Sequence, residues 1–170
     1  MLTIMPYDRA KAVEYAHRWA YRRNPAYYNF QDIGGDCTNY ASQCIFAGSG
    51  VMNYTPTYGW YYRSAADRAP AWAGVQYLFN FLTGNLGVGP FGQEVGMADI
   101  AEGDICQLNI SKNVFHHTPV IVRIEYPVSP DTIFVAAHTR DVDCRPLSTY
   151  TFSALRFVHI EGVRVESGTA

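Results

Sequence analysis

Several common features are missing from this sequence, and each absence narrows its function. The formal net charge is only −2 and no basic run is present, so neither a nucleic-acid partner nor electrostatic membrane binding is expected. No apolar run reaches the length of a transmembrane helix. The opening segment lacks the basic start and the length of a signal peptide, so no signal peptide is visible in this sequence.

Cysteines are few and widely spaced, which excludes two common uses of the residue. There are four of them, and no CxxC pair is present, so the pattern resembles neither a small disulfide scaffold nor a paired zinc site. Cys37 and Cys44 would lie two turns apart on one helix, about 10 Å, which is too far for a disulfide. We therefore expect Cys44 to be a core thiol.

The chain has an apolar composition and a clear order of predicted elements. Its 170 residues, of which 48% are hydrophobic, suit a single globular domain spanning residues 1–170. Helices followed by an antiparallel sheet favour an α+β fold. The glycine-rich segment 84–96 is expected to be a loop, and its GxGxxG match is rejected as a dinucleotide site because it follows a helix and contains proline. Apolar periodicity predicts helices over about 7–23, 36–47 and 75–83, and strands over 104–110, 118–124, 132–137 and 157–165.

The segment Gly34-Gly35-Asp36-Cys37 places a thiol at the start of a predicted helix. Backbone N–H groups are unpaired there and the helix dipole is positive, so the pKa of the thiol is expected to fall. Asp36 fits the N-cap position, and its charge opposes thiolate formation unless the carboxylate turns to cap backbone N–H groups. We predict Cys37 to be a nucleophile, with its own N–H and the Gln31 amide as candidate oxyanion donors.

A histidine pair at the start of strand 118–124 supplies the predicted base. We prefer His117 as general base and acid, and we expect His116 to face solvent or to line the cleft. A hairpin with the next strand would put residue 139 opposite residue 117, so that His138 lies beside His117 and orients its ring. Two carboxylates are alternative orienters: Asp141 and Asp143.

Residues 51–73 are rich in aromatic side chains but have no regular periodicity. Such side chains could stack on sugar or peptide in a substrate groove, or they could equally belong to the core. The groove candidates are Tyr58, Trp60, Tyr61 and Tyr62.

The residues around the cysteine resemble a known family. Residues 34–44 read GGDCTNYASQC, which strongly resembles the nucleophile segment of the bacterial putative amidase domain family. That family is related to the CHAP and NlpC-type domains of the papain-like cysteine peptidase superfamily. The resemblance covers most of the chain, through segments 7–13, 24–30, 58–61, 103–105, 117–122, 138–141, 146–148 and 157–160.

The resemblance implies a papain-like (NlpC/CHAP-like) fold, with N-terminal helices packed on an antiparallel sheet. It implies Cys37 as nucleophile, His117 as base and a polar third group near His138. It also implies hydrolysis of amide bonds in bacterial peptidoglycan, outside the cell or at the cell wall. We expect a monomer without cofactor or metal, whose partner is peptidoglycan or a peptide. Whether the bond joins sugar to peptide or lies within the stem peptide stays open.

Other functions stay open beside this one. A non-catalytic wall-binding module could use the aromatic segment, although it would not need a Cys–His pair. Another amide chemistry, such as transglutamination or deamidation of a protein, would suit the same fold. A serine hydrolase is not expected, because residues 47–50 do not form a GxSxG motif. A zinc-dependent hydrolase is a further alternative, although no HExxH motif is present. Its candidate ligands are His116, His117, His138, Asp141 and Cys144.

Overall fold

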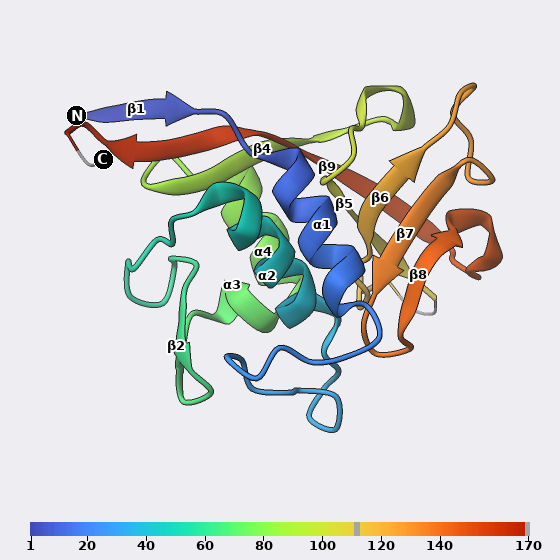
Figure 1. Ribbon diagram of the computed structural model, residues 1–170, viewed down its shortest axis with the longest axis horizontal. Helices are drawn as coiled ribbons and strands as arrows, with labels where there is room; N and C mark the ends of the chain where they lie inside the picture. Colours follow the sequence, from blue (N-terminus) through green and yellow to red (C-terminus); the bar gives the residue numbers. More distant parts are fainter. Residues whose placement is uncertain (111–112, 169–170) are drawn as a thin grey trace.

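The computed structural model describes residues 1–110 and 113–168, which form an α+β fold with an antiparallel sheet (Figure 1). The α+β prediction is thus confirmed. The helices are α1 (Arg9–Trp19), α2 (Cys37–Ser49), α3 (Pro70–Ala73) and α4 (Val75–Gly84). The main sheet contains β1 (Leu2–Met5), β4 (Gly89–Val95), β5 (Ile105–Asn109), β6 (Val120–Ile124), β7 (Ile133–Ala137), β8 (Val142–Pro146) and β9 (Ala154–Glu166). A small hairpin joins β2 (Tyr62–Ser64) to β3 (Asp67–Arg68), and 3-10 turns cover Met97–Asp99 and Leu147–Thr149.

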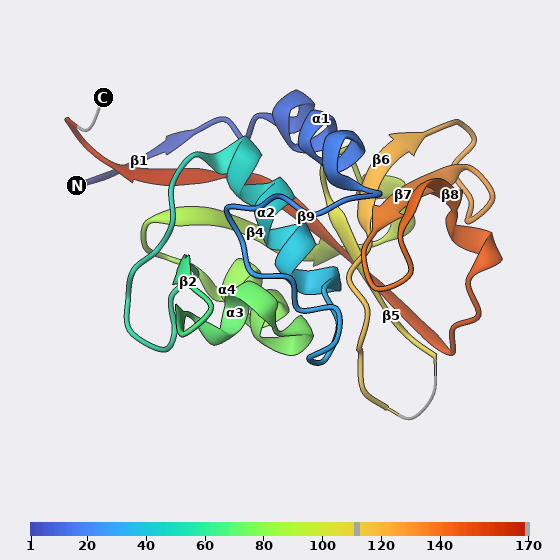
Figure 2. The same ribbon diagram turned by 60° about the horizontal axis from the view of Figure 1, so that its bottom comes forward.

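Strand β9 connects the two halves of the sheet. It pairs antiparallel with β1, β4 and β5, and the sheet continues from β5 through β6 and β7 to β8. Because β1 pairs with the end of β9, the chain begins and ends at one corner of the molecule (Figures 1 and 2). In the β6–β7 hairpin Val120 lies opposite Ala136, so the two strands pair as the sequence predicted.

The sheet separates two apolar cores. The larger core lies between the helices and one face of the sheet and contains Tyr40, Trp60 and Trp72. The smaller core lies on the other face, where Leu108 and Ile121 pack against the turn at 147–149. Cys44 is fully buried in the larger core, which confirms its prediction as a core thiol.

Segment 84–96 departs from its predicted loop structure, because it contains strand β4. In this strand Pro90 is tolerated since β4 pairs only with β9 among the described strands, which leaves one edge free of ladder hydrogen bonds. Gly92 sits at a register shift, and a Cβ there would lie 2.1 Å from the His159 carbonyl oxygen. Within the described residues, no helix combines the length and apolarity needed to cross a membrane.

Candidate active site

The predicted nucleophile lies at the first position of helix α2. Cys37 begins the helix, Asp36 occupies the N-cap position, and Gly50 ends the helix in the left-handed conformation with φ 72°. The Cys37 side chain is nearly enclosed, with 6% of the residue exposed. Its Sγ lies 3.7 Å from Thr38 Oγ1 and 3.9 Å from the His116 carbonyl oxygen. The thiol therefore meets the histidine segment, as the sequence predicted, but at the backbone of His116.

Burial determines the acidity of this thiol. Loss of solvent raises the pKa of Cys37 above its ordinary value, and hydrogen bonds from Thr38 and neighbouring groups offset this only in part. The predicted fall in pKa was wrong, because the helix dipole is weaker than the cost of placing a thiolate in an enclosed site. The thiol is consequently protonated at neutral pH and needs a base during attack.

The two glycines before the cysteine allow a tight contact with the end of strand β7. Gly35 has φ +94°, and a Cβ there would lie 2.9 Å from Thr139 Oγ1. That hydroxyl accepts a hydrogen bond from the Asp36 N–H at 3.2 Å. The glycine therefore permits the start of α2 to be bound directly to the residue that follows His138.

The Asp36 carboxylate is fully buried and does not cap the helix, contrary to the prediction. It accepts hydrogen bonds from the Phe30 N–H at 2.8 Å, from Asn39 Nδ2 at 2.9 Å and from His138 Nδ1 at 2.6 Å. Burial by itself would raise the pKa of Asp36, but these hydrogen bonds, with the one from His138 the strongest, lower it instead. Asp36 is thus an ionised carboxylate directly before the nucleophile in the chain. Its pair with His138 is called the anchor below.

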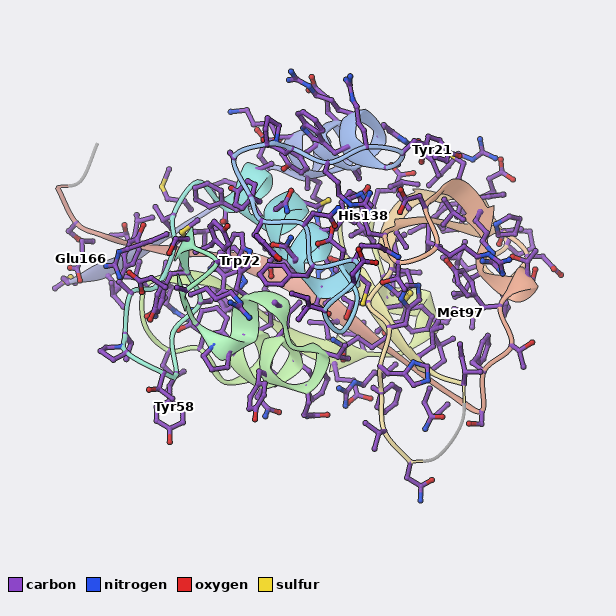
Figure 3. All side chains as sticks on the ribbon, turned by 90° about the horizontal axis from the view of Figure 1, so that it is seen from below. Tyr21, Tyr58, Trp72, Met97, His138 and Glu166 are labelled. Carbon is purple, nitrogen blue, oxygen red and sulfur yellow. The ribbon has the colours of Figure 1, made fainter. Side chains whose placement is uncertain are left out.

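His138 belongs to this anchor and not to the predicted triad. Its Nδ1 faces Asp36, its Nε2 lies 2.7 Å from the Trp19 carbonyl oxygen, and its ring stacks on Tyr40 with centroids 4.0 Å apart. The residue is buried between the helices and the sheet (Figure 3). With both ring nitrogens occupied, it has none left to orient His117. The two strands pair as predicted from Val120 opposite Ala136, but the His138 side chain turns to Asp36 and Trp19 instead of to His117.

His117 lies beside Tyr150, which packs against the smaller core. Its backbone forms an isolated antiparallel β-bridge with Leu108, and its ring centroid lies 5.6 Å from that of Tyr150. Burial, together with the charges of His116 and Arg145, lowers the pKa of His117 to about 4. The imidazole is therefore neutral at neutral pH and able to accept a proton. The neighbouring His116 is exposed, and its Nε2 accepts a hydrogen bond from the Ile110 N–H at 3.1 Å.

Two auxiliary candidates are held by one arginine. Gln31 donates to the Thr139 carbonyl oxygen at 2.6 Å and accepts from Arg23 at 3.0 Å, so its amide is occupied and is not an evident oxyanion donor. Asp141 binds Arg23 through both carboxylate oxygens, at 2.8 and 3.0 Å. Both residues brace the loop before α2 against the end of β7.

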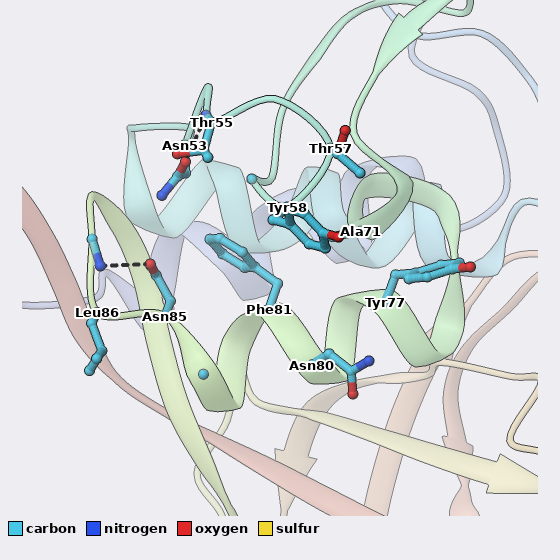
Figure 4. Close-up of a pocket in the computed structure, with 13 residues that line it drawn as sticks. Asn53, Thr55, Thr57, Tyr58, Ala71, Tyr77, Asn80, Phe81, Asn85 and Leu86 are labelled. Atoms are coloured by element: carbon cyan, nitrogen blue, oxygen red, sulfur yellow. Dashed lines mark hydrogen bonds between the residues drawn. The ribbon is translucent and has the colours of Figure 1, made fainter.

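The predicted aromatic groove is only partly formed. Trp60 is fully buried and packs on Trp72, so its assignment to a groove was wrong: without periodicity, a core aromatic could not be told from an exposed one. Tyr61 is half-buried beside Tyr54. Tyr58 is 85% exposed and lines a pocket of about 470 Å³ against helix α4 (Figure 4). Other residues lining this pocket include Tyr77, Asn80, Phe81, Asn85 and Leu86.

Sequence reasoning missed Tyr150, which lies beside His117. Its hydroxyl is buried and has no hydrogen-bond partner among the described residues. The guanidinium of Arg145 stacks on the Tyr150 ring, with Cζ 3.6 Å from the ring centroid. Buried polar atoms are almost always paired, so an unpaired hydroxyl next to a candidate base calls for an explanation. No local pattern marks this residue, because it lies in an irregular segment that only the tertiary fold brings to His117.

The predicted zinc ligands do not form one cluster. In the part of the chain that the structure describes, the group with metal-ligand spacing is His17, Asp143 and Cys144, of which only Cys144 was among those candidates. His138 is committed to Asp36, and Asp141 is committed to Arg23. The alternative of a zinc hydrolase built from His116, His117 and His138 is therefore not supported by the geometry.

Comparison with known proteins gives the family. A family model described as "Putative amidase domain" matches residues 6–160. A protein of Bacillus subtilis (strain 168), "Uncharacterized protein YhbB", is 34% identical over 120 residues, which cover 68% of this chain and 37% of that protein. The chain thus spans little more than a third of that relative's length. No solved structure gives a significant match. With the family model covering most of its length, the chain belongs to the putative amidase domain family.

Proposed function

We propose that the protein is a cysteine-dependent amide hydrolase of bacterial peptidoglycan, with a papain-like catalytic core related to NlpC and CHAP domains. The observation that carries this proposal is the position of Cys37, at the first residue of a helix and 3.9 Å from the backbone of the His116–His117 segment. Membership of an amidase-domain family adds the reaction class. A helix start offers N–H groups to a developing oxyanion, which favours acyl transfer to this thiol.

The proposed reaction starts from a neutral thiol and a neutral imidazole. His117 takes the proton from Cys37 while the sulfur attacks the amide carbonyl carbon. The resulting imidazolium protonates the leaving amine as the C–N bond breaks, which leaves a thioester. His117 then removes a proton from water, whose oxygen attacks the thioester; the C–S bond breaks, the acid is released, and the imidazolium returns its proton to the Cys37 sulfur. Negative charge developing on substrate oxygen stabilises the imidazolium, which offsets the low resting pKa of His117.

Tyr150 is our candidate for the missing oxyanion donor. Its hydroxyl lies beside His117 and has no hydrogen-bond partner in residues 1–110 and 113–168. Burial raises the pKa of Tyr150, and the Arg145 guanidinium offsets this only in part, so the phenol keeps its proton. A buried O–H that finds a partner only when the oxyanion forms would stabilise the transition state selectively.

Tyr150→Phe should therefore reduce turnover without loss of stability. We expect kcat to fall about 100-fold, because one oxyanion donor is removed, while KM changes little. The melting temperature should stay the same or rise, because the deleted hydroxyl forms no hydrogen bond with any residue that the structure describes. The control is Tyr40→Phe, which loses a hydrogen bond to the Ala16 carbonyl and should lower stability while kcat is kept. Unchanged kcat in Tyr150→Phe would remove this residue from the mechanism.

The pH dependence of kcat/KM distinguishes a neutral Cys37–His117 pair from a preformed thiolate–imidazolium pair. Because the folded pKa of His117 is about 4, kcat/KM should stay level across neutral pH and fall only as the pH drops through about 4, where the base becomes protonated. Circular dichroism at each pH would check that the fold persists. An acid limb near the ordinary histidine value of about 6.5 would contradict a buried His117 as base.

The pocket beside α4 suits an uncharged, hydroxyl-rich ligand. Tyrosine faces and side-chain amides line it, and among the described residues no charged side chain does (Figure 4). Exposed Tyr58 and Tyr77 offer stacking surfaces, and Asn80 keeps its amide N–H₂ group for a ligand because its oxygen accepts from Gln76. Sugar rings combine apolar faces with hydroxyl edges, so this lining favours a glycan strand over a charged peptide.

Digestion of purified peptidoglycan, with mass analysis of the soluble fragments, tests the proposed function. Sugar-free stem peptides with intact ends would identify an amidase that cuts between sugar and peptide. Shortened stems would identify an endopeptidase. Binding to peptidoglycan without any released fragment would identify the wall-binding module instead, and the catalytic proposal would then fail.

A further inference from the structure

A β-bulge in strand β8 brings together two adjacent side chains. Val135 of β7 lies opposite Arg145, but Ala137 lies opposite Val142, so residues 143 and 144 both face Ala136. Cys144 has φ 53°, a left-handed conformation that costs free energy in a residue other than glycine. Consecutive side chains of a regular strand point to opposite faces, and a bulge changes that direction. The strained backbone thus allows the side chains of Asp143 and Cys144 to approach the same neighbour outside the sheet, on helix α1.

That neighbour is His17, in the last turn of helix α1. His17 Nδ1 lies 2.8 Å from each Asp143 carboxylate oxygen. One ligand atom from each of His17, Asp143 and Cys144 lies within 4.8 Å of the other two. The side chains of His17 and Asp143 are 41% and 18% exposed, and Cys144 is exposed as well, so an ion can reach the group from solvent.

We propose that His17, Asp143 and Cys144 form a zinc site, with water as the fourth ligand. Zinc accepts imidazole nitrogen, carboxylate oxygen and thiolate sulfur at about 2.0–2.3 Å, so tetrahedral ligand atoms lie roughly 3–4 Å apart, which is within the spacing of this cluster. Calcium and magnesium prefer all-oxygen sites, and a nitrogen–sulfur pair does not suit them. Binding replaces the thiol proton of Cys144, which leaves to solvent.

The site would tie helix α1 to strand β8 and take no part in the reaction. Two residues after His17, the Trp19 carbonyl oxygen accepts the hydrogen bond of His138. A bound ion would therefore fix the end of α1 next to the Asp36–His138 pair. Its effect would be to raise the stability of the fold. This inference does not rest on the proposed function, because none of the three ligands belongs to the proposed catalytic machinery.

Equilibrium dialysis against zinc, after removal of metal by a chelator, tests the site in the intact chain. Wild type should retain one zinc ion per chain, and Cys144→Ser and His17→Ala should each bind at least tenfold more weakly. Cys37→Ala is the matched control and should bind as wild type does, which separates this site from the nucleophile. Zinc should also raise the melting temperature of wild type but not of Cys144→Ser.

A second measurement covers the case in which His17→Ala alters the helix. Cobalt(II) should give a thiolate charge-transfer absorption with wild type and with Cys37→Ala, and none with Cys144→Ser. The proposal is overturned if wild type retains no metal, or if Cys144→Ser and wild type bind zinc equally, which would mark adventitious binding elsewhere. If only Cys37→Ala failed to bind zinc, the ion would be bound at the nucleophile, and the proposed site would likewise be refuted.

Discussion

Replacement of Cys37 with alanine is expected to abolish amide hydrolysis, with a loss of at least about 1,000-fold in kcat. No thioester can form without the sulfur, and the remaining groups would only bind and polarise the substrate. The fold should persist, because the side chain is small and its Sγ makes only long contacts, at 3.7 and 3.9 Å. Release of soluble fragments from peptidoglycan, together with a thermal melt, measures both effects.

Cys44 provides a matched control on the same helix. Cys44 is fully buried two turns further along helix α2, away from the proposed chemistry. The substitution Cys44→Ala therefore removes a thiol from the core only. That variant should lose about 1 kcal/mol or more of unfolding free energy and keep its kcat. Hydrolysis that survives in Cys37→Ala and disappears with a chelator would point to metal chemistry and overturn the cysteine mechanism.

His138→Ala is expected to have the largest effect on stability, lowering the free energy of unfolding by about 2–3 kcal/mol. The change leaves the fully buried Asp36 carboxylate without its partner at 2.6 Å and the Trp19 carbonyl oxygen without its donor. The carboxylate keeps the hydrogen bonds from the Phe30 N–H and Asn39 and an ion pair with Arg23 at 3.4 Å, but it loses its shortest contact in a site where water cannot replace it. Denaturant titration of the variant beside wild type measures the difference.

His159 allows a comparison with a second histidine–aspartate pair. His159 Nδ1 lies 2.8 Å from Asp104, but its side chain is 29% exposed. Asp104 would also keep hydrogen bonds from Arg9 and from the Ile160 N–H. We therefore expect His159→Ala to cost no more than about 1 kcal/mol. Equal losses in the two variants would show that His138 is not a special anchor.

Acid should reduce the contribution of the Asp36 anchor. The folded pKa of Asp36 is lowered, so the stability that it supplies is complete above the unfolded value of about 3.9 and is lost as the pH falls through the folded value. His138→Ala lacks the hydrogen bond that contributes most to the lowering. The gap between wild type and His138→Ala should consequently narrow below about pH 4.

Local patterns were enough to predict the element that carries the nucleophile. The glycine pair and Asp36 mark where α2 begins, and Gly50 closes it in a left-handed conformation. The β6–β7 register followed from two apolar strands joined by a short connection. These features depend on near neighbours in the chain, so the sequence alone contains their causes.

The chemistry of the site depended on contacts that local patterns do not contain. Asp36 and His138 are 102 positions apart, and only the folded sheet decides that they pair with each other. The same holds for Tyr150, whose unpaired hydroxyl becomes visible only beside His117. The acidity of Cys37 also changed direction, because its desolvation arises from the whole surrounding structure while the helix dipole is local.

Strand β9 has a consequence for how the chain folds. It is the last strand, yet β1, β4 and β5 all pair with it, and Leu2 meets Glu166 across almost the whole sequence. Contacts so distant in sequence make folding slow, because much chain entropy is lost before they form. On a ribosome the main sheet cannot close until the residues of β9 have emerged, so the helices and the β6–β8 hairpins must wait with one side of their core uncovered.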